Sequence, residues 1–324
     1  MNNKLLLSIS PHIHKKQSIV RIMWIVFISL IPSGLAGIFI FGPRALWIIV
    51  ACITTAVITE AIILALRHKK ITITDGSAAL TGLLLAYNLP SGLPIWMACV
   101  GSFFAIAIAK QAFGGLGRNI FNPALAGRAF LLIAWPRFMV TWSKPFIYPD
   151  AVTCATPLAL LKDGKAENIY QMGLNYFDML LGVRGGCIGE VCIIALLLGA
   201  IYLLWRKIIS WHIPLSFIFT LGLLSWLWGG PEIGKGDILF SLMAGGVILG
   251  AFFMATDYVT SPLTRKGQLI FGFGCGLLTF IIRKWGGYPE GVSFAILMMN
   301  ATVPLLDRLS HPHIYGYEGV NKRV

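Results

Sequence analysis

Two apolar runs near the amino terminus decide the fold class: IMWIVFISLIPSGLAGIFIF at residues 22–41 and ALWIIVACITTAVITEAIILAL at residues 45–66. Each has the roughly 20 apolar residues that a helix needs to cross a bilayer. The whole chain shares this character, since 57% of its 324 residues are hydrophobic and only 12% are charged. Soluble domains carry about 25% charged residues and cannot bury so much apolar surface. The sequence therefore predicts a polytopic membrane protein, and it excludes a disordered chain, a coiled coil and a nucleic-acid-binding globule.

Ten segments are candidate transmembrane helices, which predicts an all-α fold. Seven of them are strongly apolar: Ile22–Phe41, Ala45–Leu66, Pro94–Ala109, Gly186–Trp205, Trp211–Trp228, Ile238–Ala255 and Gln268–Ile282. Three are shorter or interrupted by Gly and Pro: Ala78–Leu89, Phe121–Trp135 and Gly291–Leu306. Because most connecting loops are short, we expect any chemistry to take place in the helix bundle or on the one long loop, residues 136–185.

The distribution of Lys and Arg predicts the orientation of the bundle in the plasma (inner) membrane. Cytoplasmic loops are enriched in these residues, and here most of them lie in loops on the side of the amino terminus. The net charge of +13 fits such loops, so we expect a lipid bilayer as partner and no nucleic acid. The predicted organisation is a cytoplasmic tail (1–21), five spans (22–135), an extracytoplasmic loop (136–185), five spans (186–306) and a cytoplasmic tail (307–324).

A weak internal symmetry suggests how the spans are related. Gly114-Gly115 precede the fifth expected span on the inner side, and Gly286-Gly287 precede the tenth on the outer side. Each pair is followed by an interrupted span that contains Asn, at Asn122 and Asn300. Two five-helix repeats of inverted orientation, which are typical of transport folds, would give this pattern. Glycine pairs are also common in membrane loops, so the pattern alone leaves both explanations open.

The long outer loop contains PDAVTCATPLALLK at residues 149–162, which allows two interpretations. In the structural one, Thr156 is the N-cap of a short helix whose first residue is Pro157. In the functional one, the Thr156 hydroxyl accepts a covalent modification, because Pro157 favours an extended backbone that could present the Thr156 side chain outward. Asp150 and Thr153 would then help in recognition of the loop. The residues alone do not choose between the two.

Part of this loop, DAVTCATPL at residues 150–158, resembles a known flavinylation motif. The motif belongs to the family of the D subunit of the Rnf complex (RnfD) and the B subunit of the sodium-translocating NADH:quinone reductase (NqrB). In that family the last Thr carries FMN through a phosphoester bond, and the resemblance places this bond at Thr156. Asp150 and Thr153 match further motif positions, whereas Ala151 and Cys154 stand where the family often has Gly.

The resemblance extends over essentially the whole chain. It is carried by SPHI (10–13), DGSAALTGLLL (75–85), KQAFGGLGRNIFNPA (110–124), GCIGE (186–190) and ATDYVTSPLT (255–264). The short amino-terminal tail is more similar to the Rnf protein than to the longer quinone-reductase protein. The resemblance implies about ten transmembrane helices in two inverted five-helix repeats, a fold similar to urea transporters.

The resemblance also implies a function. The chain would be the FMN-carrying membrane subunit of a translocase that passes electrons between ferredoxin and NAD, coupled to Na⁺ or H⁺ movement. Some members of the family also hold riboflavin non-covalently in the bundle. The other Rnf subunits would be its partners, and a flavin transferase would attach the FMN. We expect the NAD and ferredoxin sites on other subunits, since this chain has no Rossmann glycine motif and no cysteine cluster for an iron–sulfur centre.

Three carboxylates are candidates for an ion path: Glu60, Asp75 and Asp257. A charge inside a bilayer is costly, so each invites a functional hypothesis. Structural roles are at least as well supported, with Glu60 in a hydrogen bond or ion pair, Asp75 as a helix N-cap beside Gly76, and Asp257 as the cap of a turn. Neither the cysteines nor the histidines have the spacing of metal ligands, so no metal site is predicted.

Two further functions are compatible with the composition and the expected fold. A stand-alone solute channel or transporter would use the same broken helices, but it would need neither a modified Thr156 nor partner subunits. A structural scaffold with a degenerate flavin motif is the third alternative. The presence of both Asp150 and Thr156 counts against the scaffold.

Overall fold

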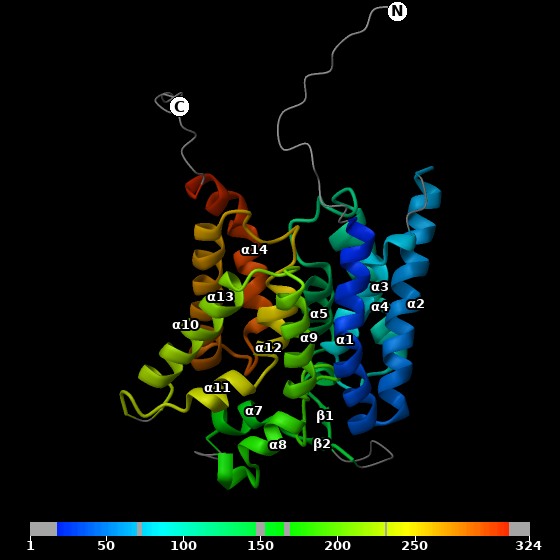
Figure 1. Cartoon of the computed structure of the whole chain (residues 1–324). Coiled ribbons are helices and arrows are strands. Elements are labelled where there is room, and N and C mark those ends of the chain that lie inside the picture. The colour runs from blue at the N-terminus through cyan, green and yellow to red at the C-terminus, as the bar shows by residue number, and fades with distance from the viewer. Residues whose placement is uncertain (1–17, 70–72, 147–152, 165–168, 231, 311–324) are drawn as a thin grey trace, which may run out of the picture.

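The computed structural model describes residues 18–69, 73–146, 153–164, 169–230 and 232–310, and this part of the chain is mainly helical. Figure 1 shows the helices side by side in one bundle, with a small layer across its lower end. The start of α1 and the end of α14 both lie at the upper end. Asp150 and most of both expected tails lie outside the described residues.

All five spans expected in the first half form helices. These are α1 (Ile19–Phe41), α2 (Pro43–Leu66), α3 (Ser77–Tyr87), α4 (Ile95–Ile106) and α5 (Pro123–Ala134). A 3-10 turn, η1 (Ile73–Asp75), precedes α3, and a π-helical turn, η2 (Ala107–Gln111), continues α4. The short helix α5 begins where the Asn122 side chain accepts a hydrogen bond from the Ala124 N–H at 3.1 Å, with Pro123 in the first helical position.

The second half contains one correction to the expected spans. Four of its helices are continuous: α9 (Ile193–Trp205), α10 (His212–Trp228), α13 (Arg265–Trp285) and α14 (Val292–Leu309). The prediction of one span over Ile238–Ala255 is wrong, because this segment is divided into α11 (Ile238–Met243), α12 (Val247–Leu249) and a π-helical turn, η4 (Gly250–Met254). The break falls at Gly245 and Gly246, whose φ angles of 65° and 66° are left-handed and end the helix.

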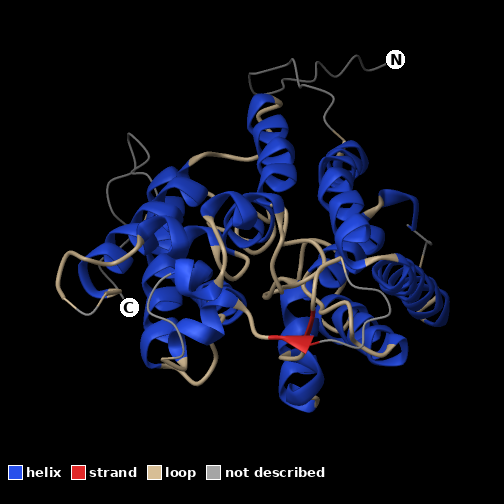
Figure 2. Cartoon of the chain, turned by 90° about the horizontal axis from the view of Figure 1, so that it is seen from below, coloured by secondary structure: helices blue, strands red, loops and turns tan. Residues whose placement is uncertain are grey.

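The long loop after α5 forms the layer at the lower end of the bundle. It contains α6 (Pro136–Met139), β1 (Trp142–Ser143), β2 (Thr153–Cys154), α7 (Pro157–Lys162), η3 (Ile169–Met172) and α8 (Tyr176–Leu181). The two strands pair antiparallel, with Trp142 opposite Cys154. Figure 2, which views the molecule from this end, shows the small sheet among the helices. We call this segment the capping layer.

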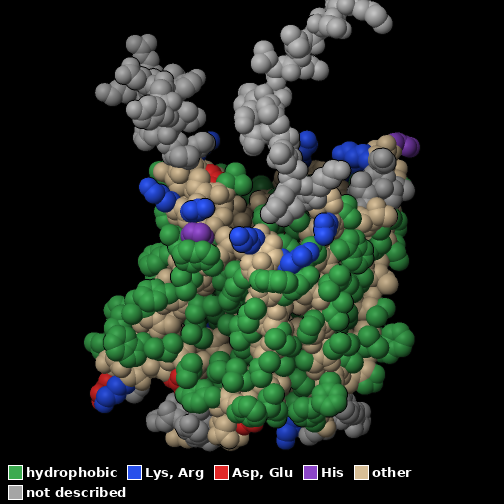
Figure 3. Space-filling model, in the orientation of Figure 1, with side chains coloured by type: hydrophobic (Ala, Val, Ile, Leu, Met, Phe, Trp, Pro, Cys, Tyr) green, Lys and Arg blue, Asp and Glu red, His purple; other side chains and the backbone are tan. Residues whose placement is uncertain are grey.

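The surface of the bundle suits a lipid environment. The helices α1, α2, α13 and α14 are long and apolar enough to cross a membrane, and α3, α4 with η2, α5, α9 and α10 are apolar but shorter. Large apolar side chains point outward, among them Phe39, Leu66 and Trp205. Figure 3 shows apolar side chains over the sides of the bundle and Lys and Arg gathered at its upper end. The chain is a multi-pass membrane protein.

The two halves have similar packing patterns. In the first, α2 packs against α3 and α4, and α4 packs against α5; in the second, α10 packs against α11 and α13, and α13 packs against α14. The halves meet where α1 packs against α9 and α5 against α14. At the second contact, Asn300 accepts a hydrogen bond from the Asn122 N–H at 3.0 Å when its amide is oriented to satisfy its neighbours.

The GCIGE segment is not helical, which corrects the prediction of a span that begins at Gly186. It runs beside the end of α3, where the Ile188 N–H donates to the Leu89 carbonyl at 3.0 Å and the Gly189 N–H donates to the Tyr87 carbonyl at 3.1 Å. Helix α9 begins only at Ile193. Irregular backbone at such depth is tolerated when protein groups satisfy it. Gly189 is required here, because a Cβ would lie 2.2 Å from the Tyr87 ring.

Candidate functional site

Thr156 lies in the capping layer, at the start of α7. Its backbone is extended, with φ −68° and ψ 150°, and its hydroxyl oxygen accepts a hydrogen bond from the Ala159 N–H at 3.2 Å. Pro157 fills the first helical position, so the prediction of an N-cap is confirmed. The expectation that the side chain points outward is wrong, since Thr156 is only 5% exposed.

Thr156 borders a cavity of about 430 Å³ between the capping layer and the bundle. Small-molecule sites in proteins span about 300–1,000 Å³. The wall combines aromatic side chains and cations: Trp142, Tyr288, Phe294, Arg128 and Arg137. Such a wall offers both stacking surface and positive charge to a flat, anionic molecule. We call this space the Thr156 cavity.

Two charges from different elements meet in the wall of the Thr156 cavity. Arg128, which lies on α5 and is 7% exposed, forms an ion pair with Glu290 through Nη2. Its Nη1 donates to the Asn88 side-chain oxygen at 2.7 Å. Both Arg128 and Glu290 line the cavity, so this pair would face whatever the cavity binds.

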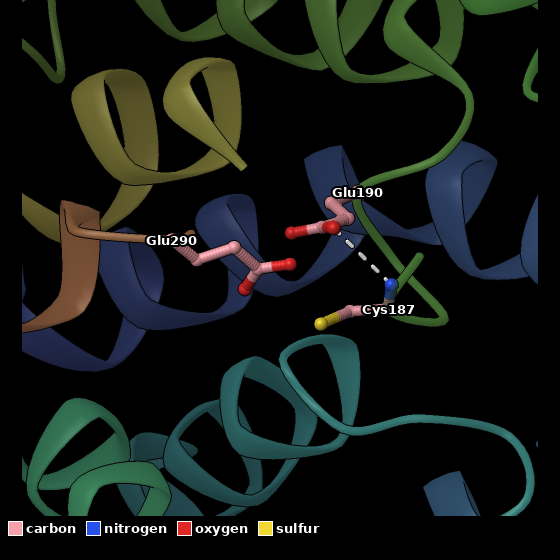
Figure 4. A group of neighbouring side chains, drawn as sticks. All are labelled: Cys187, Glu190 and Glu290. Atoms are coloured by element: carbon pink, nitrogen blue, oxygen red, sulfur yellow. Dashed lines mark hydrogen bonds between the residues drawn. The ribbon is translucent and has the colours of Figure 1, made fainter. Parts of the chain in front are cut away.

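A second carboxyl group lies next to this ion pair. Glu190, at the end of GCIGE, is 3% exposed, and its Oε1 accepts a hydrogen bond from the Cys187 N–H at 3.2 Å. One carboxylate oxygen each from Glu190 and Glu290 and the Cys187 sulfur all lie within 4.8 Å of one another. Figure 4 shows the two carboxyl groups pointing toward each other. The fold thus joins residues that are far apart in the sequence.

A separate polar network occupies the upper part of the bundle. Lys110 Nζ lies 2.8 Å from one oxygen of Glu60 and donates to the other at 2.9 Å, and it also donates to the Ser77 hydroxyl at 2.7 Å. The Gln111 amide donates to Glu60 at 2.7 Å. Glu60 and Lys110 are each 2% exposed. The expectation of a structural ion pair at Glu60 is confirmed, whereas its role in an ion path stays a prediction.

The other two ion-path candidates lie close to this network. The Asp75 carboxylate accepts hydrogen bonds from the N–H and the hydroxyl of Ser77, both at 2.8 Å, beside the left-handed Gly76. The Asp75 side chain thus binds the first residue of α3, but the N-cap position itself is Gly76, so the N-cap prediction for Asp75 is wrong by one residue. Asp257 accepts a hydrogen bond from the Thr260 hydroxyl at 3.0 Å, as expected for a turn cap, and shares a cavity of about 80 Å³ with Lys110 and Ser77. Glu60, Asp75 and Asp257 thus gather at one end, away from Thr156.

Thr153 and Cys154 form β2, just before Thr156 in the chain. The backbone of Thr153 pairs with Ser143 in the small sheet, and Asp150 lies outside the described residues. The Cys154 thiol, which is half-buried, donates to the Ser143 carbonyl at 3.6 Å. Burial raises the pKa of this thiol, and the charge of Lys144 opposes the shift. Cys154 is therefore less acidic than a free cysteine.

Comparison with known proteins agrees with this architecture. Residues 6–316 match the model of the NQR2, RnfD, RnfE family. The chain belongs to the NQR2, RnfD, RnfE family. It is 51% identical over 316 residues to the D subunit of the proton-translocating ferredoxin:NAD(+) oxidoreductase complex of Clostridium ljungdahlii, which covers 96% of each chain. It is 48% identical over 323 residues to the D subunit of the Na(+)-translocating ferredoxin:NAD(+) oxidoreductase complex of Acetobacterium woodii, which covers 99% of this chain and 98% of the relative.

A more distant relative belongs to a complex of the same kind. The D subunit of the ion-translocating oxidoreductase complex of Stutzerimonas stutzeri is 41% identical over 330 residues, which covers 93% of each chain. These relatives are subunits of ion-translocating oxidoreductase complexes, and those from Clostridium ljungdahlii and Acetobacterium woodii are named for ferredoxin and NAD(+). The expected resemblance to the D subunit of the Rnf complex is confirmed.

Two residues that line the Thr156 cavity, Arg128 and Glu290, were not predicted from the sequence. Arg128 was detectable as a charge inside an apolar span, because such charges are rare and face protein partners. Glu290 gave no signal, since it follows a glycine-rich loop that resembles an exposed turn. Glu190 is the last residue of the GCIGE segment, which was quoted only for the resemblance, and its proximity to Glu290 depends on the fold.

Proposed function

We propose that the chain is the FMN-carrying membrane subunit of an ion-translocating ferredoxin:NAD(+) oxidoreductase complex. The observation that carries the proposal is the position of Thr156, which is buried in the wall of a cavity of about 430 Å³. The relatives that are 51% and 48% identical, and whose names include this activity, support it. Other subunits of the complex would be its partners, and a flavin transferase would attach FMN through a phosphoester to the Thr156 hydroxyl.

The residues around Thr156 fit FMN in both size and chemistry. Tyr288 and Phe294 stack with their ring centres 5.9 Å apart, and they line the cavity together with Trp142. Aromatic faces suit the flat isoalloxazine, and Arg128 and the exposed Arg137 supply positive charge for phosphate or for a reduced, anionic ring. A bound flavin would supply electron transfer, while these side chains would orient it and set its potential.

The structure also supports a division of the bundle into two inverted five-helix repeats. We propose α1–α5 and α9–α14 as these repeats, with α11, α12 and η4 together as the counterpart of one helix, because equivalent helices have equivalent neighbours and Asn122 meets Asn300 between them. The ends of α2, α9 and α14 and the start of α13 carry basic residues and lie at the upper end in Figure 1. By the excess of positive charge, this end would be cytoplasmic and the capping layer extracytoplasmic. Riboflavin, if held by this chain, would be a second, non-covalent cofactor.

Mass analysis of the purified subunit tests the flavin assignment. Wild-type protein from cells that contain the flavin transferase should carry one FMN less water, and peptide mapping should place it on Thr156. Thr156→Ala should remove the added mass and the flavin fluorescence of the denatured band, whereas Thr156→Ser should retain part of both. Thr141→Ala is the control, because it removes an exposed hydroxyl of the capping layer that lies outside the motif. Covalent flavin on Thr156→Ala would refute the assignment.

A further inference from the structure

The Glu190 carboxyl group combines deep burial with an incomplete set of contacts. The residue is 3% exposed, and its Oε1 accepts the Cys187 N–H. Its Oε2 is buried and has no hydrogen-bond partner among the described residues. Figure 4 shows the carboxyl groups of Glu190 and Glu290 directed at each other, and they approach within 4.8 Å. A buried carboxylate with a free oxygen is strongly disfavoured, whereas a protonated carboxyl group is not.

The neighbouring cations do not neutralise Glu190 by direct contact. Arg128 donates to Glu290 and Asn88, and Arg283 donates to the carbonyls of Ser241, Ala244 and Gly245. Arg184 reaches only the backbone carbonyl of Glu190, at 3.5 Å. Within the described part of the chain, the charged and titratable groups that act on Glu190 are these three guanidinium groups, Cys187 and Glu290.

The contacts within this cluster favour a proton, rather than a metal ion, as the ligand of Glu190. A metal ion would need several ionised ligands, but Glu290 already pairs with Arg128 and the Cys187 thiol donates to the Asn88 carbonyl, so neither is free to bind one. A proton on Glu190 removes the repulsion between the two carboxyl groups and leaves Glu290 ionised against Arg128. When two carboxyl groups share a buried site, protonation of one of them relieves the repulsion between their charges.

We infer that Glu190 is a proton-binding site in the bundle and that the Arg128–Glu290 ion pair couples it to the Thr156 cavity. Arg128 and Glu290 line that cavity, and both act on Glu190. Negative charge in the cavity attracts Arg128, which leaves Glu290 less neutralised, so the fraction of Glu190 that is still ionised takes up a proton from water. When the charge leaves, the O–H bond of Glu190 breaks and the proton departs. This coupling, unlike the proton site itself, rests on the proposed function, since reduced flavin is the source of the charge.

Infrared spectroscopy of the purified full chain tests the proton site. At neutral pH the protein should show a carboxylic acid C=O band that shifts in D₂O and shifts again when the glutamates carry ¹³C in their side-chain carboxyl groups. Glu190→Gln should remove this band. Glu232→Gln should keep it, because Glu232 is exposed and pairs with Lys235 at 2.7 Å. If the wild-type protein lacks a glutamic acid band, or if Glu190→Gln retains it, the inference is overturned without reference to flavin.

A reduced-minus-oxidised infrared difference spectrum of the intact complex tests the coupling. Reduction should increase the Glu190 band, and both Glu190→Gln and Thr156→Ala should abolish that increase. The static band should persist in Thr156→Ala, since the proton site does not require flavin. Absence of FMN from Thr156 in the mass analysis would refute the proposed function and leave the static band to decide the proton site. FMN on Thr156 without any change in the band on reduction would refute the coupling alone.

Discussion

Two buried ion pairs near opposite ends of the bundle differ in how completely their polar atoms are satisfied. At the upper end both oxygens of Glu60 accept hydrogen bonds, and Lys110 contacts both Glu60 and Ser77. Near the capping layer, polar atoms around the Arg128–Glu290 pair stay without partners among the described residues: Glu190 Oε2, Arg184 Nε and Arg283 Nε. The cavity beside Lys110 has a volume of about 80 Å³, whereas the Thr156 cavity beside the Arg128–Glu290 pair has a volume of about 430 Å³.

This difference separates a structural charge pair from a functional one. Nearly all buried polar atoms in folded proteins have partners, so a concentration of unpaired atoms needs an explanation such as a ligand or a catalytic role. An ion pair whose polar atoms all have hydrogen-bond partners needs no such explanation, because these contacts already account for its burial. On this ground we expect the Glu60–Lys110 pair to contribute stability, and we expect the proposed ligand-dependent chemistry at the cluster beside Thr156.

Removal of one partner from the satisfied pair should have the largest effect. Lys110→Ala leaves Glu60 as an uncompensated charge that is 2% exposed, which should cost about 3–5 kcal/mol in the free energy of unfolding. The measurement is thermal unfolding of the purified protein in detergent. As control, Glu60→Leu combined with Lys110→Met should restore most of the stability, since no charge is left unpaired. A stable Lys110→Ala protein would show that the pair is not structural and would favour the ion path.

Removal of the Arg128 side chain should destabilise the protein less than removal of the Lys110 side chain does. Its partner Glu290 is 13% exposed and can recruit water, so Arg128→Met should cost about 1–3 kcal/mol. Arg137→Met is the matched control, because Arg137 lines the same cavity from an exposed position and surface substitutions stay within about 0.5 kcal/mol. Both variants can be compared by thermal unfolding. Equal effects of the two changes would argue against a buried Arg128–Glu290 pair.

The sequence predicted the elements better than their interruptions. Hydropathy located the helices, because a long apolar run has few alternatives in a membrane. It did not reveal the break after Met243, because hydropathy depends on composition, while the break depends on the left-handed backbone of Gly245 and Gly246. It also treated GCIGE as the start of a helix, since only the pairing of Ile188 and Gly189 with the end of α3 makes an extended backbone stable there.

The candidate site was predictable only in its local part. Thr156 as an N-cap follows from its neighbours, because a hydroxyl before Pro157 satisfies the first turn of a helix. The burial of Thr156 and its shared cavity with Arg128 and Glu290 depend on contacts between segments that are distant in the sequence. No local pattern encodes such contacts, which explains why Glu290 was missed and why Asp257 was not linked to Lys110.

The cap role of Thr156 predicts a smaller, separable effect. In protein from cells that lack the flavin transferase, Thr156→Ala should lower the free energy of unfolding by about 1 kcal/mol, because the Ala159 N–H loses its partner. Thr156→Ser should be close to wild type, since the hydroxyl stays. Thermal unfolding of the three proteins measures this difference. If both variants are equally destabilised, lost methyl packing rather than the cap is responsible.

The smallest expected effect is on the reactivity of cysteine side chains at the two ends of the bundle. It tests the proposal that these ends lie on opposite sides of the membrane. In cells whose protein lacks its other cysteines, a membrane-impermeant maleimide should label Cys154 from outside, whereas a cysteine introduced as Lys266→Cys should react only after the membrane is opened. Burial raises the Cys154 pKa, so the thiolate fraction is small at neutral pH and labelling should accelerate as the pH rises. A free small-molecule thiol, measured in parallel, should react faster than Cys154 at neutral pH. Labelling of Lys266→Cys from outside would invert the proposed orientation and place the Thr156 cavity on the cytoplasmic side.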